Sequence, residues 1–232
     1  MTDRLTVPWP DASLFAERDG RPLRILAVSD EPDPSLEARA TRDALGQVDV
    51  VVGAGDLQPD YLAFVADAFG APLHYVRGNH DVGTAWAHAL GGLLPAPMPE
   101  ARLVAEGRLG LIGFSGSPVY SHRGHEVGAG TMWRHAFAGW MRARSSGPLI
   151  VVSHAPPRGL NDASDPTHRG FAAFRWLVDR LAPPIWLHGH TALVRRGLDA
   201  RCTRHGPTLL YNCTGATLVE LVPAGSRPVS HG

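Results

Sequence analysis

Five short apolar runs in this chain each end at a residue that can bind a metal ion or move a proton. The first three runs are 24–28, 49–52 and 73–76, and helical patterns separate them. The later two are 149–152 and 185–187. Strands that alternate with helices predict a largely parallel α/β sheet, and such sheets place their sites at the carboxyl ends of the strands. We therefore expect the residues that follow the five runs to share one site.

The pattern along the chain predicts one domain at residues 23–222, because no linker-like segment divides it. Residues 1–22 are expected to form an extended arm on the surface, and residues 223–232 a short tail. A hairpin is predicted at 102–114, with Gly107 in its turn. Two or three antiparallel strands are predicted in 199–222.

Two helices of this pattern bear on the packing. Asp33 and Pro34 are typical of a helix start, and the helix they begin is expected to reach Leu45 before Gly46. A second helix at 131–144 carries large apolar side chains along one side, which we expect to pack in the core: Trp133, Phe137, Trp140 and Met141.

Composition excludes several classes of protein. Lys and Arg together number 22, as do Asp and Glu, so the net charge is zero and a generally basic, nucleic-acid-binding surface is not expected. No apolar run approaches the ~18 residues of a membrane span, so no membrane partner is expected. The first residues lack a signal-peptide pattern, and two cysteines give no disulfide framework. We therefore expect a cytoplasmic protein. The high count of 12 histidines favours a search for metal ligands.

The residues that follow the apolar runs form an oxygen and nitrogen donor set. They are Asp30, Asp56, the Asn79-His80-Asp81 triplet, His154 and His190. Each alone is as well explained by a turn or a helix cap. Such residues at five strand ends together favour a shared site, and this donor set suits Mn, Fe or Zn ions.

In order and spacing, these motifs resemble those of the calcineurin-like metallophosphoesterases. That family carries Asp-x-His, Gly-Asp, Gly-Asn-His-Asp or -Glu, a single His and Gly-His-x-His. This chain has, in the same order, Asp30-Glu-Pro32, Gly55-Asp56, Gly78-Asn-His-Asp81, His154 and Gly189-His-Thr-Ala192. The resemblance covers residues 24–222. The stretch from Ser153 to Pro157, with Asp162 and His168 after it, also resembles a subset of the family.

The resemblance implies a fold and an activity. The fold is a β-sandwich of two mixed sheets flanked by helices, in α/β/β/α layers. The activity is hydrolysis of phosphomonoesters or phosphodiesters by metal-activated water, with one or two divalent ions of Mn²⁺, Fe²⁺/Fe³⁺ or Zn²⁺. The substrate would be a small phosphorylated molecule such as a nucleotide.

The resemblance also implies roles for individual residues. The metal ligands would be Asp30, Asp56, Asn79, His154 and His190. His80 would be the general acid that protonates the leaving oxygen. Asp81 would hold the other nitrogen of the His80 ring.

Two histidines of the family pattern are missing, since position 32 is Pro and position 192 is Ala. By resemblance both belong to the first metal site, which would keep only Asp30 and Asp56, whereas the second site keeps its whole set. We therefore expect a mononuclear enzyme with an altered first site, where Glu31 is the first choice for a replacement ligand. Two alternatives stay open: a two-metal enzyme with a rebuilt first site, and a low-activity or inactive relative that binds a nucleotide or phosphate.

Overall fold

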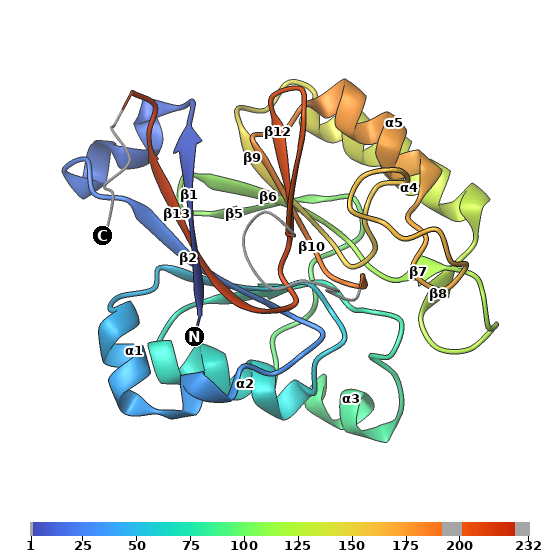
Figure 1. The fold of residues 1–232 in the computed structure, drawn as a ribbon, viewed down its shortest axis with the longest axis horizontal. Coiled ribbons are helices and arrows are strands. Elements are labelled where there is room, and N and C mark those ends of the chain that lie inside the picture. The colour runs from blue at the N-terminus through green and yellow to red at the C-terminus, as the bar shows by residue number, and fades with distance from the viewer. Residues whose placement is uncertain (1, 192–200, 226–232) are drawn as a thin grey trace.

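The computed structural model describes residues 2–191 and 201–225, and these form four layers (Figure 1). Helices α1 (Arg39–Leu45), α2 (Pro59–Phe69) and α3 (Thr84–Ala89) cover one sheet. Helices α4 (Ala129–Ala143) and α5 (Ala172–Leu181) cover the other. The predicted α/β/β/α sandwich is therefore confirmed. Position 192 and the end of the expected tail lie outside the described residues.

The first sheet has the strand order β1-β13-β2-β3-β4. Its strands are β1 (Asp3–Trp9), β13 (Gly215–Pro223), β2 (Leu23–Ser29), β3 (Val50–Gly53) and β4 (Leu73–Tyr75). Strands β2, β3 and β4 run parallel, whereas β13 is antiparallel to β2. The carboxyl ends of β2, β3 and β4 therefore lie at one edge of the sheet.

The second sheet has the order β11-β12-β10-β9-β6-β5. Its strands are β11 (Cys202–His205), β12 (Thr208–Asn212), β10 (Ile185–His188), β9 (Leu149–Ser153), β6 (Leu109–Phe114) and β5 (Leu103–Glu106). The four central strands are parallel, and β5 and β11 are antiparallel at the two edges. The hairpin predicted around Gly107 is the β5–β6 pair. Beyond both sheets lie the short pair β7 (Ser117–Pro118) and β8 (Glu126–Val127).

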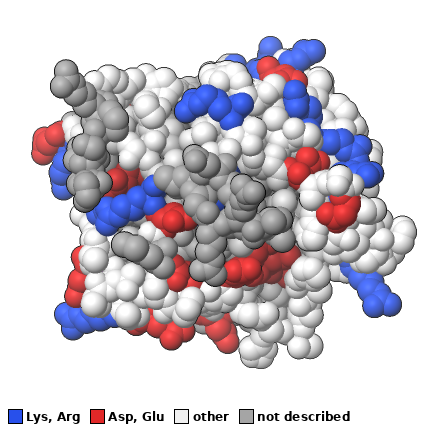
Figure 2. All heavy atoms as spheres, viewed as in Figure 1, with Lys and Arg blue, Asp and Glu red and all other residues white. Residues whose placement is uncertain are grey.

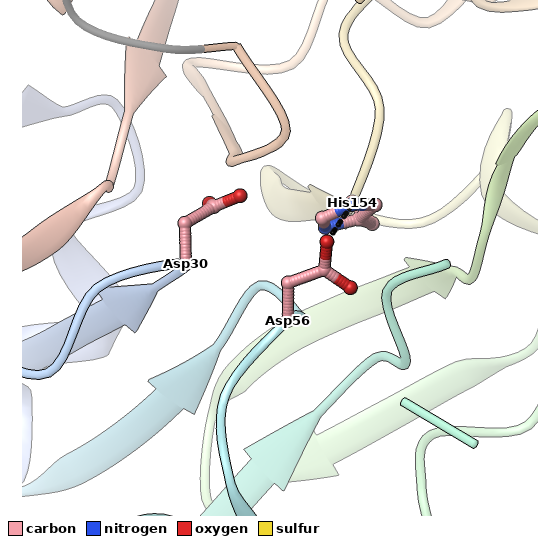
Figure 3. A group of neighbouring side chains, drawn as sticks. All are labelled: Asp30, Asp56 and His154. Atoms are coloured by element: carbon pink, nitrogen blue, oxygen red, sulfur yellow. Dashed lines mark ion pairs between the residues drawn. The ribbon is translucent and has the colours of Figure 1, made fainter. Parts of the chain in front are cut away.

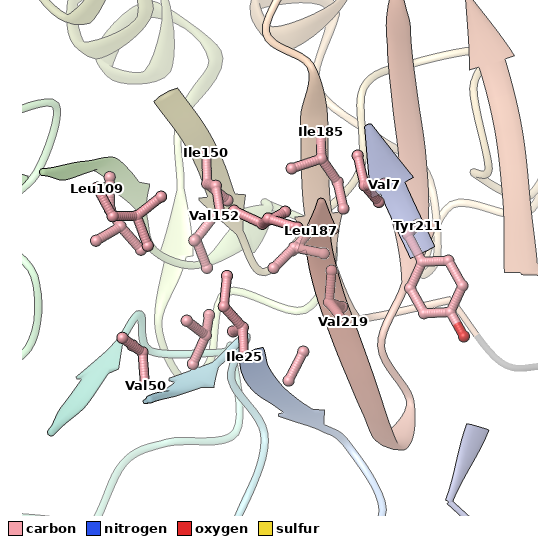
Figure 4. Close-up of a cluster of buried hydrophobic side chains, with 14 of the residues drawn as sticks. Val7, Ile25, Val50, Leu109, Ile150, Val152, Ile185, Leu187, Tyr211 and Val219 are labelled. Atoms are coloured by element: carbon pink, nitrogen blue, oxygen red, sulfur yellow. The ribbon is translucent and has the colours of Figure 1, made fainter. Parts of the chain in front are cut away.

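The main hydrophobic core lies between the two sheets (Figure 4). Ile25 and Val50 project from the first sheet toward Leu109, Ile150 and Ile185 of the second. Strands that are covered on both faces need apolar residues at nearly every position, which is why these strands are continuous apolar runs in the sequence. Two further clusters lie under the helices, one on the outer side of each sheet.

The expected surface arm contributes an edge strand to the first sheet. Strand β1 pairs in parallel with β13, and Leu5, Val7 and Trp9 are buried in the core between the sheets. The alternation of these three residues with polar ones is the period of a half-buried strand. Pro8 is compatible with this position, because an edge strand has one row of amide groups that needs no partner strand.

The helix expected to run from Pro34 to Leu45 is broken. A 3₁₀ turn, η2 (Pro34–Glu37), comes first, Ala38 is extended, and α1 follows it. A second 3₁₀ segment, η1 (Ala12–Arg18), follows β1. In the predicted antiparallel tail, β11 and β12 form such a pair, but β13 crosses to the other sheet.

Helix α4 packs with a different face from the one expected, and of its four expected core residues only Trp140 packs, partly buried, against the core under the helix. Trp133, Phe137 and Met141 are 40%, 53% and 43% exposed. The side that faces the sheet carries small residues such as Ala136 and Gly139, and a Cβ at Gly139 would lie 2.9 Å from the Phe114 ring. Near Gly139 the helix lies so close to the sheet that a side chain does not fit between them, whereas Met132, nearer the start of the helix, is fully buried there.

Over the described residues, no helix has both the length and the apolar character needed to cross a membrane. Acidic and basic side chains are interspersed on the face of the molecule shown in Figure 2, in keeping with the balanced composition.

Candidate metal centre and its pocket

Three side chains from separate strand ends converge at the seam between the two sheets. Asp30 follows β2, Asp56 lies just beyond β3, and His154 follows β9. Each offers one ligand atom, and these three atoms all lie within 4.8 Å of one another (Figure 3). The strand-end pattern predicts that these residues meet, but from one sheet, whereas the structure brings them together from two.

The backbone at these positions is unusual and explains how the side chains turn inward. Asp30, Asp56 and His190 have φ angles of 58°, 56° and 67°. This left-handed region is uncommon for residues other than glycine, and a residue held there costs of order 1–3 kcal/mol. Such strain is concentrated at functional sites, where the surrounding structure maintains it.

His154 is fully buried and has a defined orientation. Its Nδ1 lies 2.9 Å from the carbonyl oxygen of Ala54, which only accepts hydrogen bonds, so Nδ1 carries a hydrogen. Its Nε2 lies 2.9 Å from Oδ1 of Asn79 and 3.3 Å from Oδ2 of Asp56. When the ring is neutral, Nε2 and the two oxygens all carry lone pairs and none of them has a hydrogen to share. A proton on Nε2 or a bound cation would make this arrangement favourable.

The local electrostatics agree with this requirement. Burial disfavours the protonated ring, but the hydrogen bond and charge of Asp56 outweigh it and raise the pKa of His154 to about 9. Burial likewise tends to raise the pKa of Asp56, but the His154 contact holds it below its usual value. In the metal-free protein a proton therefore occupies the place that a divalent ion would take.

His190 lies beside His154 and has a ring nitrogen without a partner, although it is not one of the three residues whose ligand atoms lie within 4.8 Å of one another. Its side chain is buried, its ring centroid lies 4.9 Å from that of His154, and within the described part of the chain Nε2 has no hydrogen-bond partner. Burial and the charge of His154 lower the pKa of His190 to about 3, so its ring is neutral. A buried polar atom without a partner costs about 1–3 kcal/mol, and a metal ion would satisfy it. The donor set therefore fits a divalent cation.

Asp30 is largely occupied by donors of the protein itself. Both carboxylate oxygens accept from the His190 amide at 3.0 Å, and Oδ2 also accepts from the hydroxyls of Ser29 at 2.6 Å and Thr214 at 3.4 Å. Burial raises the pKa of this carboxyl. Asp30 thus ties the end of β2 to the turn that carries His190.

His80 lies in the pocket wall with its side chain 76% exposed. Its amide donates to Oδ1 of Asp56 at 2.8 Å, and its Nε2 is 4.0 Å from Oδ2 of the same carboxylate. This position leaves the ring free to meet a bound molecule.

Asp81, which was expected to hold the His80 ring, is hydrogen-bonded to the backbone of two loops. Its buried carboxylate accepts from the amides of Gly78 at 2.7 Å and Asp56 at 3.0 Å. Burial raises its pKa to about 6. Asp81 therefore supports the two loops that carry Asp56 and Asn79, and it does not orient the imidazole.

Replacing Asp81 with alanine is expected to reduce the free energy of unfolding by about 1–3 kcal/mol, because two buried amides lose their acceptor. The measurement is urea denaturation of the metal-free protein. Asp81→Asn keeps a side-chain oxygen of the same shape and is the matched control, with a smaller expected loss. A stable Asp81→Ala protein whose pH–rate profile shifts would instead support a direct partnership with His80.

An open pocket of about 430 Å³ is lined by Asp30, Asp56, Asn79, His80 and His190. Glu31, exposed on its rim, is close enough to contact a bound molecule. The wall also includes three residues to which the strand-end pattern assigns no role: Tyr120, Thr191 and Thr214. His168 is a further wall residue, hydrogen-bonded to Asp165, with its ring centroid 5.7 Å from that of His190.

Comparison with known proteins agrees with this geometry. The calcineurin-like phosphoesterase family model matches residues 23–193. No curated protein matches the sequence significantly. Among solved structures, the protein TT1561 of Thermus thermophilus superimposes with a TM-score of 0.57 at 16% identity, covering 84% of this chain and 90% of that one. A dimetal phosphatase from Danio rerio gives a TM-score of 0.52 at 14% identity, covering 84% and 88%. The match over most of its length shows that this chain belongs to the calcineurin-like phosphoesterase family.

Proposed function

We propose that this protein hydrolyses phosphoesters with one divalent metal ion, held by Asp56, Asn79, His154 and His190. The observation that carries the proposal is the approach of His154 Nε2 to Oδ1 of Asn79 and Oδ2 of Asp56, because nitrogen and oxygen donors gathered in this way suit a divalent cation. The bare, buried Nε2 of His190 supports it.

When bound, the ion would lower the pKa of a water molecule and polarise a phosphoryl oxygen. The chain's own residues supply the remaining functions. His80, exposed to the pocket, donates a proton to the leaving oxygen. Oδ1 of Asp30 accepts one hydrogen bond from the described residues, which leaves it capacity to orient the attacking water.

The function is tested by hydrolysis of p-nitrophenyl phosphate and bis(p-nitrophenyl) phosphate with Mn²⁺, each repeated after chelation by EDTA. We expect turnover of at least one ester that EDTA abolishes and Mn²⁺ restores. Equal rates with and without EDTA would contradict a metal-dependent reaction. The ratio of the two rates would also distinguish a monoesterase from a diesterase.

A single tight metal ion is expected, because the first site retains only two of its ligands. Asp30 moreover directs both oxygens at protein donors, and residues 32 and 192 have no side chain that binds metals. We predict one equivalent of metal per chain by elemental analysis after dialysis against metal-free buffer. Two tightly held equivalents would contradict this and support a rebuilt first site, with Glu31 as the ligand to test by Glu31→Gln.

A phosphate- or nucleotide-binding protein with little turnover is the second candidate. The surroundings of His80 favour it, since its Nε2 is 4.0 Å from Oδ2 of Asp56 and the Asp81 carboxylate accepts from two backbone amides instead. A metal-loaded protein that binds inorganic phosphate but hydrolyses no ester in a substrate panel would support this alternative.

A further inference from the structure

The loop between β6 and α4, residues 115–128, is hydrogen-bonded to the segment that carries Asn79. The amide of Gly116 donates to the Arg77 carbonyl at 2.7 Å, and that of His125 donates to the Asn79 carbonyl at 2.9 Å. Gly124, at a φ of 70°, packs so closely on the Asn79 carbonyl that any Cβ would collide with it. The loop and the metal-ligand segment therefore form one structural unit.

Glu126 fixes the turn that presents Tyr120. Its carboxylate accepts from the amides of Tyr120 at 3.1 Å, Ser121 at 3.1 Å and His122 at 2.9 Å. Three amides held by one carboxylate leave the turn little freedom. The Tyr120 side chain is thereby held in the pocket wall, together with Asp56, Asn79 and His80.

The hydrogen bond between Tyr120 and Asn79 leaves the hydroxyl hydrogen of Tyr120 available for another acceptor. Asn79 directs Oδ1 at His154, so its Nδ2 lies on the other side and donates to the Tyr120 hydroxyl oxygen at 3.0 Å. An amide nitrogen only donates, so the phenol is the acceptor here and its own hydrogen is not used in this contact. Among the described residues that hydrogen has no acceptor, and Tyr120 lines the pocket.

We propose that Tyr120 donates this hydrogen to a non-bridging oxygen of the phosphoryl group, while its oxygen keeps the Asn79 amide turned with Oδ1 toward the metal. The proposal rests on the proposed function, because it needs a phosphoryl group in the pocket. The Tyr120 hydroxyl thus both binds the substrate and orients a metal ligand. A hydrogen bond to a charged oxygen changes affinity by about tenfold to hundredfold.

The test is Tyr120→Phe, which removes only the hydroxyl. Its matched control is Tyr61→Phe, since the Tyr61 hydroxyl also accepts a hydrogen bond, from the Asp33 amide at 2.9 Å, but lies outside the pocket wall. Calorimetry measures binding of Mn²⁺ and then of inorganic phosphate to the Mn²⁺-loaded protein. Steady-state kinetics on p-nitrophenyl phosphate give KM and kcat separately.

In Tyr120→Phe we expect phosphate affinity to fall and KM to rise by about tenfold to hundredfold. Mn²⁺ stoichiometry should not change, and Mn²⁺ affinity should fall by about tenfold, as for other groups that orient a metal ligand. Tyr61→Phe should match the wild type in all of these. Glu126→Ala, which frees the turn without altering the phenol, should shift phosphate affinity in the same direction by a smaller factor.

Unchanged phosphate affinity in Tyr120→Phe would overturn the proposal, while metal-dependent turnover in the same samples would leave the proposed function standing. A wild type that binds Mn²⁺ and phosphate but hydrolyses nothing would refute the proposed function, and the phosphate comparison would still decide the role of Tyr120. A wild type that binds neither would overturn both.

Discussion

Replacing His154 with alanine is expected to remove tight metal binding and to reduce hydrolysis to the rate without enzyme. The imidazole is fully buried between Asn79 and Asp56, and its Nδ1 is already fixed by the Ala54 carbonyl. Loss of a group that merely orients a ligand weakens metal binding by about 10–100-fold, so loss of the ligand itself should exceed about 100-fold. Elemental analysis and Mn²⁺ calorimetry measure the effect.

A suitable control is His74→Ala. His74 is partly buried and, like His154, faces a carboxylate, with Glu106 at 3.0 Å. It lies on β4 outside the pocket wall. It should retain wild-type metal content. A His154→Ala protein that keeps one tightly bound ion would show that the metal centre lies elsewhere.

Replacing His80 with alanine is expected to retain the metal and lose about 10²–10⁴-fold in kcat, the usual contribution of a general acid. The ring is exposed to the pocket and lies beside Asp56 without being part of the converging donor set. The size of the loss should depend on the leaving group. Phenyl phosphate needs protonation of its leaving oxygen more than p-nitrophenyl phosphate does, so it should suffer the larger loss.

The exposed His88 on α3 supplies the control variant, His88→Ala, which should behave as the wild type. An equal loss on both esters would contradict proton donation by His80 and indicate that the ring only binds the phosphoryl group. Wild-type turnover by His80→Ala on both esters would exclude either role.

The sequence predicts which strand ends carry the site residues better than it predicts their hydrogen-bond partners. Strand ends are visible as apolar runs, so the approach of Asp30 and Asp56 follows from parallel pairing of β2 and β3. His154 comes from the second sheet, and its approach depends on how the two sheets pack. Asp81 is adjacent to His80 in sequence, yet its side chain supports the turn between Gly78 and Asp81. Sequence adjacency does not determine the direction of a side chain in a turn.

Tyr120 was missed because its contact is long-range and its loop has no period. It meets Asn79 across 41 residues of sequence, from a loop whose shape depends on Glu126. Packing gave two further differences. The alternation of apolar and polar residues in β1 is visible in the sequence, whereas the inward face of α4 depends on how closely the helix approaches Phe114, which periodicity does not report.

The donor atoms come from both sheets of the sandwich. Asp56 and Asn79 follow strands of the first sheet, and His154 and His190 follow strands of the second. An ion bound by all four would link the two sheets, and it would bind only the folded chain, in which the four residues lie together. Ligand at about 100 times its dissociation constant stabilises a fold by about 2.7 kcal/mol. Metal supply would then raise the free energy of unfolding of this protein, as well as its rate of hydrolysis.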